Sequence, residues 1–350
     1  MCVEHSHPSP DEAARKRTGR AGRPEQDGQL EMPRLACSPS PGCMLPGAER
    51  HGCGCAGREA NCGRGRLASP QGDAHPPQWQ GPLPGGRPRL GSGPNDQDET
   101  IGANHPFLDI ALGLATRGIA TLRYDKRTLD YPKIIDPRTF TPTQEYVPDA
   151  LAAIKLLEHK AAIDSHHIFV LGHSQGGTYA PLIAKEAPNV AGVVLLAAGA
   201  ETLGHALLRQ VRYLATLPGA VGAQAKSELP EATQIASEID NVAQLEKDSA
   251  ATVLFGGVGP AHYLSELRYN EVATARSIRQ PLLVLQGDRD YQVTVANDLA
   301  VWLAGLKGRN GVTVVQFPYA DHLFLDGTGP PTPLDYTQPG HVDPKGLFGI

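Results

Sequence analysis

The stretch that decides the fold is Gly172-His173-Ser174-Gln175-Gly176. It follows an apolar run at 168–171 and precedes a segment with a helical pattern at 177–185. A strand, a sharp turn and a helix in this order present a serine oxygen at the head of a helix, where backbone N–H groups can receive an oxyanion. Small flanking residues let the strand and the helix approach each other. The stretch predicts Ser174 as a nucleophile and the Gln175 N–H as an oxyanion donor, the alternative being a glycine-rich turn with an exposed serine.

Candidate partners for the serine follow it along the chain. A serine hydroxyl needs a base, and the base needs a carboxylate that fixes its tautomer. Asp288 and Asp290 come just after an apolar run that ends at 285, and His322 comes just after another that ends at 317. Serine, acid and histidine in this order, each at the end of a strand, predict a catalytic triad. This order leaves both aspartates open as the acid.

Strands and helices alternate along the chain from residue 106. The expected helices span about 106–117, 144–162 and 295–306, and the expected strands span 119–124, 168–171, 190–198, 281–288 and 312–317. Such alternation predicts an α/β fold, with a mostly parallel sheet and helices on both faces.

The strand pattern stops between about 199 and 265. Two amphipathic stripes replace it, one over 203–217 and the other over 229–245. An all-helical insertion at the carboxyl ends of the strands predicts a cap over the site, with two ordinary outer helices as the alternative. The expected domains are therefore a core in two parts, residues 91–200 and 271–350, and a helical cap at 201–270.

Residues 1–90 differ from the rest in composition. They are rich in Gly, Pro, Arg and Ser and hold all six cysteines of the chain, without a C-x-x-C pair that would suggest zinc. The first residues also lack the apolar segment of an export signal. We expect a disordered leader with incidental cysteines.

The composition also limits the partners. The formal net charge is −5, and the part after residue 90 is acidic, so nothing indicates nucleic acid. The longest apolar run, 190–200, is too short to span a bilayer. We expect a soluble protein without a membrane span, cytoplasmic by default, whose oligomeric state the sequence does not specify.

Several motifs together carry a resemblance to a known family. They are GSGPNDQDET at Gly91–Thr100, RYDKRT at Arg123–Thr128, GHSQG at Gly172–Gly176, QGDRDYQV at Gln286–Val293 and DHLF at Asp321–Phe324. The segment from Gly91 to about Pro344 resembles the bacterial esterase branch of the α/β-hydrolases, related to dienelactone hydrolase and the S33 serine peptidases.

The resemblance implies the α/β-hydrolase fold and assigns a role to each candidate residue. Ser174 would be the nucleophile, His322 the base and Asp290 the orienting acid, with Asp288 the lesser candidate. Gln175 and Ser92 would supply the two oxyanion donors. His173 is expected to be a structural neighbour of the elbow, because its side chain points away from that of Ser174.

The chain departs from the family at both ends. The family has an apolar strand ending in His-Gly before the Ser-Gly-Pro, but residues 84–91 read PGGRPRLG, with Leu90 in place of the histidine. Prolines and charges cannot form a buried central strand, so we expect a gap beside the nucleophile strand. The usual final helix is missing after Lys345. We hypothesise that a reading-frame or gene-boundary change altered both ends, which the other frames of the upstream DNA can test.

The expected function is hydrolysis of small-molecule carboxylic esters through an acyl-enzyme. No cofactor is expected, and the sequence has no metal-ligand spacing or phosphate-binding loop. A peptidase or acyltransferase of the same fold is one alternative, and a catalytically inactive or truncated hydrolase-like protein is another. The acyl group, the alcohol and the physiological substrate are not predicted.

Overall fold

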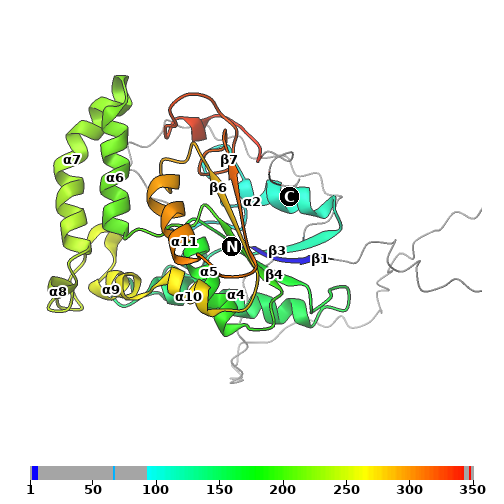
Figure 1. The fold of residues 1–350 in the computed structure, drawn as a ribbon. Helices are drawn as coiled ribbons and strands as arrows, with labels where there is room; N and C mark the ends of the chain where they lie inside the picture. Colours follow the sequence, from blue (N-terminus) through cyan, green and yellow to red (C-terminus); the bar gives the residue numbers. More distant parts are fainter. Residues whose placement is uncertain (1, 7–65, 68–92, 343–346, 348–350) are drawn as a thin grey trace, which may run out of the picture. The chain divides into compact units, whose positions relative to one another are not determined.

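The computed structural model of this chain describes residues 2–6, 66–67, 93–342 and 347, all within one compact unit. Its strands form one sheet in the order β2-β3-β1-β4-β5-β6-β7 (Figure 1). The strands are β1 (Cys2–Ser6), β2 (Arg66–Leu67), β3 (Ile119–Arg123), β4 (Ile168–His173), β5 (Gly192–Leu196), β6 (Leu282–Gly287) and β7 (Val312–Phe317). The helices are α2 (Pro106–Ala115), α3 (Arg127–Asp130), α4 (Pro142–Glu158), α5 (Gln175–Glu186), α6 (Leu203–Thr216), α7 (Gly219–Ile239), α8 (Val242–Leu245), α9 (Pro260–Arg268), α10 (Glu271–Ser277) and α11 (Ala300–Gly305).

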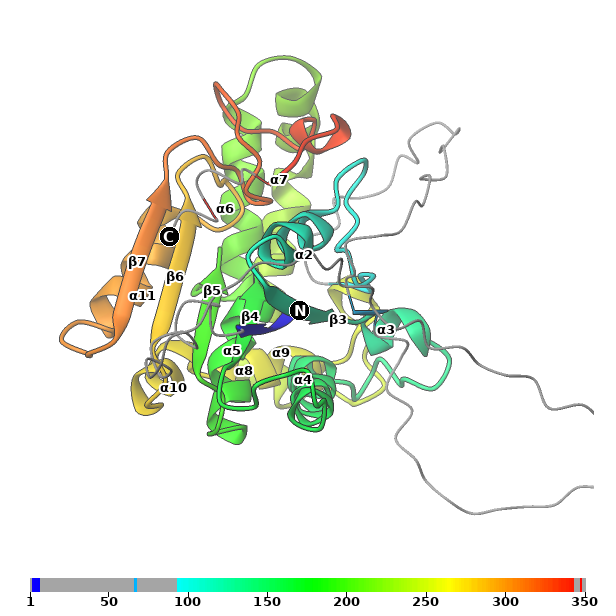
Figure 2. The same ribbon diagram turned by 90° about the vertical axis from the view of Figure 1, so that its right-hand side faces the viewer.

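The part of the sheet that carries the site is parallel. Strands β4, β5, β6 and β7 each pair in parallel with the next. Figure 2 shows the strand direction rotating from β7 and β6 on one side to β3 on the other, as expected for a twisted sheet. The predicted mostly parallel sheet with helices is confirmed.

Both faces of the sheet are buried, and alternate residues of a strand face opposite sides. In β4, Val170 joins the core formed with α4, α5 and α11, whereas Leu171 joins the core formed with α2 and the segment 320–325. Leu195 and Leu196 divide in the same way in β5. Burial on both sides explains why these strands read as continuous apolar runs instead of alternating ones.

The prediction of a gap beside the nucleophile strand β4 was wrong. The N-terminal strand β1 lies there, antiparallel to both neighbours: Cys2–Ser6 pair with β3, and four of these residues also pair with β4. Backbone N–H and C=O groups alone form these ladders, so the unpaired edges of β3 and β4 accept a segment with little apolar character. The short strand β2 pairs with β3 on its other side. Of the predicted leader, 1–90, the structure describes only these two strands.

Local signals set the helix ends. The helix α4 begins earlier than its apolar stripe because Thr141 and Gln144 form a capping box: the Gln144 N–H donates to Thr141 Oγ1 at 3.3 Å and the Thr141 N–H to Gln144 Oε1 at 2.9 Å. The predicted helix 295–306 opens instead with a π-helical turn, Val295–Leu299, before α11.

Two long helices occupy the predicted insertion. Figure 1 shows α6 and α7 side by side, and they share an apolar core of their own, which includes Leu207, Val211 and Ala232. Most of the first predicted stripe and the first half of the second lie at this contact, whereas Ile239 and Leu245 join a separate core and the second stripe continues into α8. In the described part of the chain, no helix has the length and apolar character that crossing a membrane requires.

The position of β1 gives a first testable expectation. We expect Val3→Pro to lower the melting temperature strongly, because proline removes an N–H from a strand paired on both sides. The control Val3→Thr keeps both the N–H and the β-branch and is expected to melt near the parent. Thermal unfolding followed by circular dichroism measures both; equal melting temperatures for the two variants would show that β1 contributes nothing.

Candidate active site

The turn between β4 and α5 holds Ser174 in a strained conformation. Its φ is +53° and its ψ −124°, a region that residues other than glycine rarely occupy. The Ser174 N–H donates to the Leu196 carbonyl at the end of β5 (2.9 Å), and the Ser174 carbonyl accepts from the Thr178 N–H in α5 (3.1 Å). The predicted strand, sharp turn and helix are thus present, and the neighbouring strand and the helix fix the turn.

Two glycines make this turn possible, and only one of them belongs to the pentapeptide Gly172–Gly176. A Cβ at Gly172 would lie 2.2 Å from the Gly176 carbonyl oxygen, and one at Gly177 would lie 2.8 Å from the Ala198 Cβ. A Cβ at Gly176 would meet nothing closer than 3.7 Å, at Tyr146. The steric requirement predicted for the flanking glycines therefore holds at Gly172 but not at Gly176, and it extends to Gly177.

His322 and Asp290 form a buried pair after neighbouring strands. His322 Nδ1 lies 2.7 Å from Asp290 Oδ2, and the two residues are 3% and 5% exposed. The other carboxylate oxygen accepts N–H groups from Gln292 at 2.7 Å and Val293 at 2.9 Å. Asp288 is exposed and accepts instead from the Gln316 side chain. Of the two candidate acids, Asp290 is the one in contact with His322.

The surroundings of His322 favour its charged form. Burial alone would lower its pKa, but the charge and hydrogen bond of Asp290, with the charges of Glu99 and Asp321, raise the pKa above its ordinary value. Asp321 also shapes the turn, since its Oδ1 accepts the N–H groups of Leu323 (2.9 Å) and Leu325 (3.1 Å). Burial raises the pKa of Asp321 to about 6.

The backbone brings His322 to the elbow. His173 Nε2 donates to the His322 carbonyl oxygen at 2.7 Å, and the two imidazole ring centroids are 4.6 Å apart. Among the described residues, Ser174 Oγ makes no hydrogen bond to His322. Such contacts are often long before substrate binds and tighten in the complex.

Of the two predicted oxyanion donors, Gln175 and Ser92, the structure describes only Gln175. Gln175 is the first residue of α5, where backbone N–H groups lack partners within the helix. Its side chain is held on both sides: Tyr146 OH donates to Oε1 at 3.0 Å, and Nε2 donates to Glu266. Burial raises the pKa of Glu266 to about 7, although the bond from Gln175 opposes this. Ser92 lies outside the described residues.

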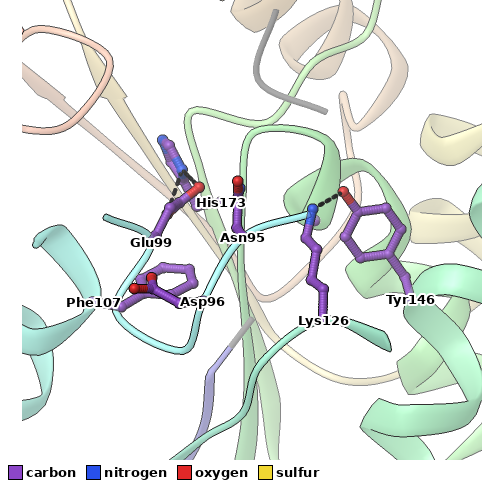
Figure 3. A pocket seen from close by; sticks show the side chains of 8 residues that line it. Asn95, Asp96, Glu99, Phe107, Lys126, Tyr146 and His173 are labelled. Atoms are coloured by element: carbon purple, nitrogen blue, oxygen red, sulfur yellow. Dashed lines mark hydrogen bonds and ion pairs between the residues drawn. The ribbon is translucent and has the colours of Figure 1, made fainter. Parts of the chain in front are cut away.

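Glu99 is the residue near the site that the sequence reasoning missed. Both of its carboxylate oxygens lie 2.9 Å from His173 Nδ1. Figure 3 shows the side chains of Glu99 and His173 pointing toward one another on one side of Asn95, and Lys126 pointing to Tyr146 on its other side. Burial would raise the pKa of Glu99, but the charge and hydrogen bond of His173 outweigh it and lower the pKa to about 2. The only sequence signal was its place in the Gly91–Thr100 motif.

The fold and the elbow with its neighbouring histidine–aspartate pair define an α/β-hydrolase. A family model described as serine aminopeptidase, S33, matches residues 105–324, and the chain belongs to this family. It is also 37% identical over 270 residues to Esterase EstD of Thermotoga maritima. That match covers 77% of this chain and 61% of EstD, so the chain spans about three-fifths of its relative's length.

Solved structures resemble the chain more distantly. Est1E from Butyrivibrio proteoclasticus, with ferulic acid bound, is 16% identical with a TM-score of 0.42, covering 66% of this chain and 78% of Est1E. The Pyrococcus furiosus esterase PF2001 is 18% identical with a TM-score of 0.39, covering 62% and 68% of the two chains.

The glycine contacts give a second expectation. We expect Gly172→Ala and Gly177→Ala each to lower the free energy of unfolding by about 1–3 kcal/mol, because the added methyl groups meet the backbone or a packed Cβ. The matched variant Gly176→Ala meets only ordinary contact distances and is expected to unfold near the parent. Urea unfolding measures all three; a Gly176→Ala protein as unstable as the other two would contradict the steric explanation.

Proposed function

We propose that this chain is a serine hydrolase that cleaves small-molecule carboxylic esters, with Ser174 as nucleophile, His322 as base and Asp290 as orienting acid. The observation that supports it most is the buried 2.7 Å contact between His322 and Asp290, on a turn tied to the residue before Ser174. A base oriented by a carboxylate beside a strained serine is what nucleophilic acyl transfer needs.

In the proposed reaction, Ser174 Oγ attacks the ester carbonyl carbon while His322 Nε2 takes the hydroxyl proton. Collapse of the tetrahedral intermediate breaks the bond to the alcohol oxygen, which receives that proton from His322. Water then attacks the acyl-serine, again giving its proton to His322, and the second collapse returns the proton to Ser174 and releases the acid. Ser174, His322, Asp290 and water account for every proton.

Four hydrogen-bond donors surround the carboxylate of the proposed acid, Asp290. The N–H groups of Gln292 and Val293 bind one oxygen, and His322 and the Gln286 amide, at 3.4 Å, approach the other. A carboxylate held in this way fixes the proton on His322 Nδ1, which leaves Nε2 to face the nucleophile. The backbone N–H groups of Gln175 and Ser92 are the proposed oxyanion donors.

Esters are proposed before amides because the relative EstD is named an esterase. The matched family is described as an aminopeptidase family, so a peptidase remains the second candidate, with an acyltransferase of the same fold. We also propose that α6 and α7, within residues 201–270, form a cap. Arg209 of α6 supports this, since its guanidinium donates to the Tyr291 and Gln292 carbonyls at 3.0 and 2.9 Å, next to Asp290.

The nucleophile is tested with the purified chain and a short p-nitrophenyl ester. We expect Ser174→Ala to lose at least about 10³-fold in kcat and to lose labelling by a fluorophosphonate, because the proposed acyl-enzyme forms on the Ser174 hydroxyl. A panel of matched esters, amides and thioesters then ranks the substrate classes. Hydrolysis by Ser174→Ala at the parent rate would refute the proposed function.

The base and the acid are tested by the pH dependence of kcat/KM. The rate is expected to fall at low pH as His322 becomes protonated, and because the pKa of His322 is raised, the midpoint of this fall lies above that of an ordinary histidine. We expect Asp290→Asn to move the midpoint down and to lower kcat about 10³- to 10⁴-fold, since the charge that raises the pKa is gone. The control Asp288→Asn changes an exposed carboxylate and should leave both values near the parent. Equal effects of the two variants would exclude Asp290 as the acid.

A further inference from the structure

The pair of Glu99 and His173 is built like the proposed catalytic pair but lies outside the three proposed catalytic residues. Both residues are buried, and Glu99 adopts a left-handed conformation with φ of +52°. The loop that carries Glu99 is held at several points. Asp96 accepts the Thr100 N–H at 2.8 Å, and Asp98 forms an ion pair with Arg123 of β3. The structure thus fixes Glu99 beside His173.

The hydrogen-bond partners define the protonation state of His173. Its Nε2 lies 2.7 Å from the His322 carbonyl, which only accepts, so Nε2 carries a proton. Its Nδ1 lies 2.9 Å from both oxygens of Glu99, which also only accept while the carboxyl is ionised. Two acceptors require two N–H donors. With Glu99 ionised, these contacts call for an imidazolium beside a carboxylate, and the two charges then cancel.

We propose that His173, held doubly protonated by Glu99, is a positioning residue: its Nε2–H holds the backbone of the base His322, and its charge cancels that of Glu99 near the base. This inference rests on the proposed function, because His322 must be the base for its position to matter. The Nε2–H bond joins the end of β4, directly before Ser174, to the turn after β7 that carries His322. It therefore sets the distance between the nucleophile and the base at the backbone level.

The charged groups around the base show why the cancellation matters. Asp290, Glu99 and Asp321 face His322 and each raises its pKa, while the His173 ring packs against its own. Lys126 and His173 face Glu99 and lower the pKa of its carboxyl. An uncompensated Glu99 would add negative charge beside the base and would hold a proton on His322.

Two substitutions separate the two bonds of His173. Asparagine places its amide nitrogen near the position of Nδ1 and keeps a donor for Glu99, but nothing reaches the His322 carbonyl. Glutamine places its amide near Nε2 and keeps that donor instead. We expect His173→Asn to lose about 10²-fold in kcat with little change in KM, and His173→Gln to stay within about tenfold of the parent. The control His341→Asn replaces an exposed histidine and should change neither kcat nor KM.

The charge of the Glu99–His173 pair is tested by the acid limb of the pH profile of kcat/KM, the range in which the rate falls as the pH is lowered. In His173→Gln, Glu99 loses its cation, so the limb is expected to move to higher pH by about one unit. The double variant Glu99→Gln/His173→Gln removes the charge and should return the limb to the parent position. This measurement needs only the glutamine variants, so it tests the proposal even if His173→Asn does not fold.

All rates are expressed per serine that reacts with a fluorophosphonate, so that loss of folded protein is not counted as loss of kcat. The positioning role would be overturned if His173→Asn and His173→Gln had the same kcat per reacting serine. It would also be overturned if the acid limb of kcat/KM did not move in His173→Gln. Either result with an inactive Ser174→Ala leaves the proposed function intact. An active Ser174→Ala would refute the proposed function itself.

Discussion

The close approach of β4 to α5 is the constraint on which the site depends. Gly172 and Gly177 leave no room for a Cβ, because the helix begins almost in contact with the last residues of the strand. The chain must therefore reverse within one residue, and Ser174 takes the left-handed conformation that this reversal requires. The same geometry makes Ser174 the residue directly before α5, whose first N–H groups have no partner within the helix. The turn at Ser174, its strain and the position of the first turn of α5 follow from one contact between a strand and a helix.

Strain is concentrated around this contact. In the described part of the chain, four residues other than glycine have a positive φ, namely Glu99, Ser174, Ala197 and Phe324. Each belongs to an element of the candidate site: the Glu99 loop, the elbow, the end of β5 and the turn after His322. Their N–H groups donate to the backbone, as Ala197 does to the Leu285 carbonyl at 2.9 Å. Apolar cores on both faces of the sheet stabilise the surrounding structure and so maintain these conformations.

The sequence predicted the features that local patterns encode. The elbow, the parallel strands and the order of serine, acid and histidine all produce periodic or short-range signals, and the strand 312–317 was predicted at its observed bounds. The strand β1 could not be predicted, because its pairing is a backbone interaction over more than a hundred residues of chain and its side chains carry no period. The role of Glu99 was hidden for a related reason: its partner His173 is 74 residues away, and nothing local distinguishes a buried glutamate from an exposed one.

The two buried histidine–carboxylate pairs differ in what the second ring nitrogen contacts. In both pairs Nδ1 lies against a carboxylate, at 2.9 Å for His173 and 2.7 Å for His322. His173 Nε2 is committed to a carbonyl oxygen, which fixes its proton and makes the ring a rigid link. His322 Nε2 makes no hydrogen bond among the described residues, so it can accept and release a proton. One ring is therefore tied to the backbone and the other keeps an unbonded ring nitrogen, which is the division that the proposed positioning residue and the proposed base require; the carbonyl that fixes the first ring is the backbone of the second.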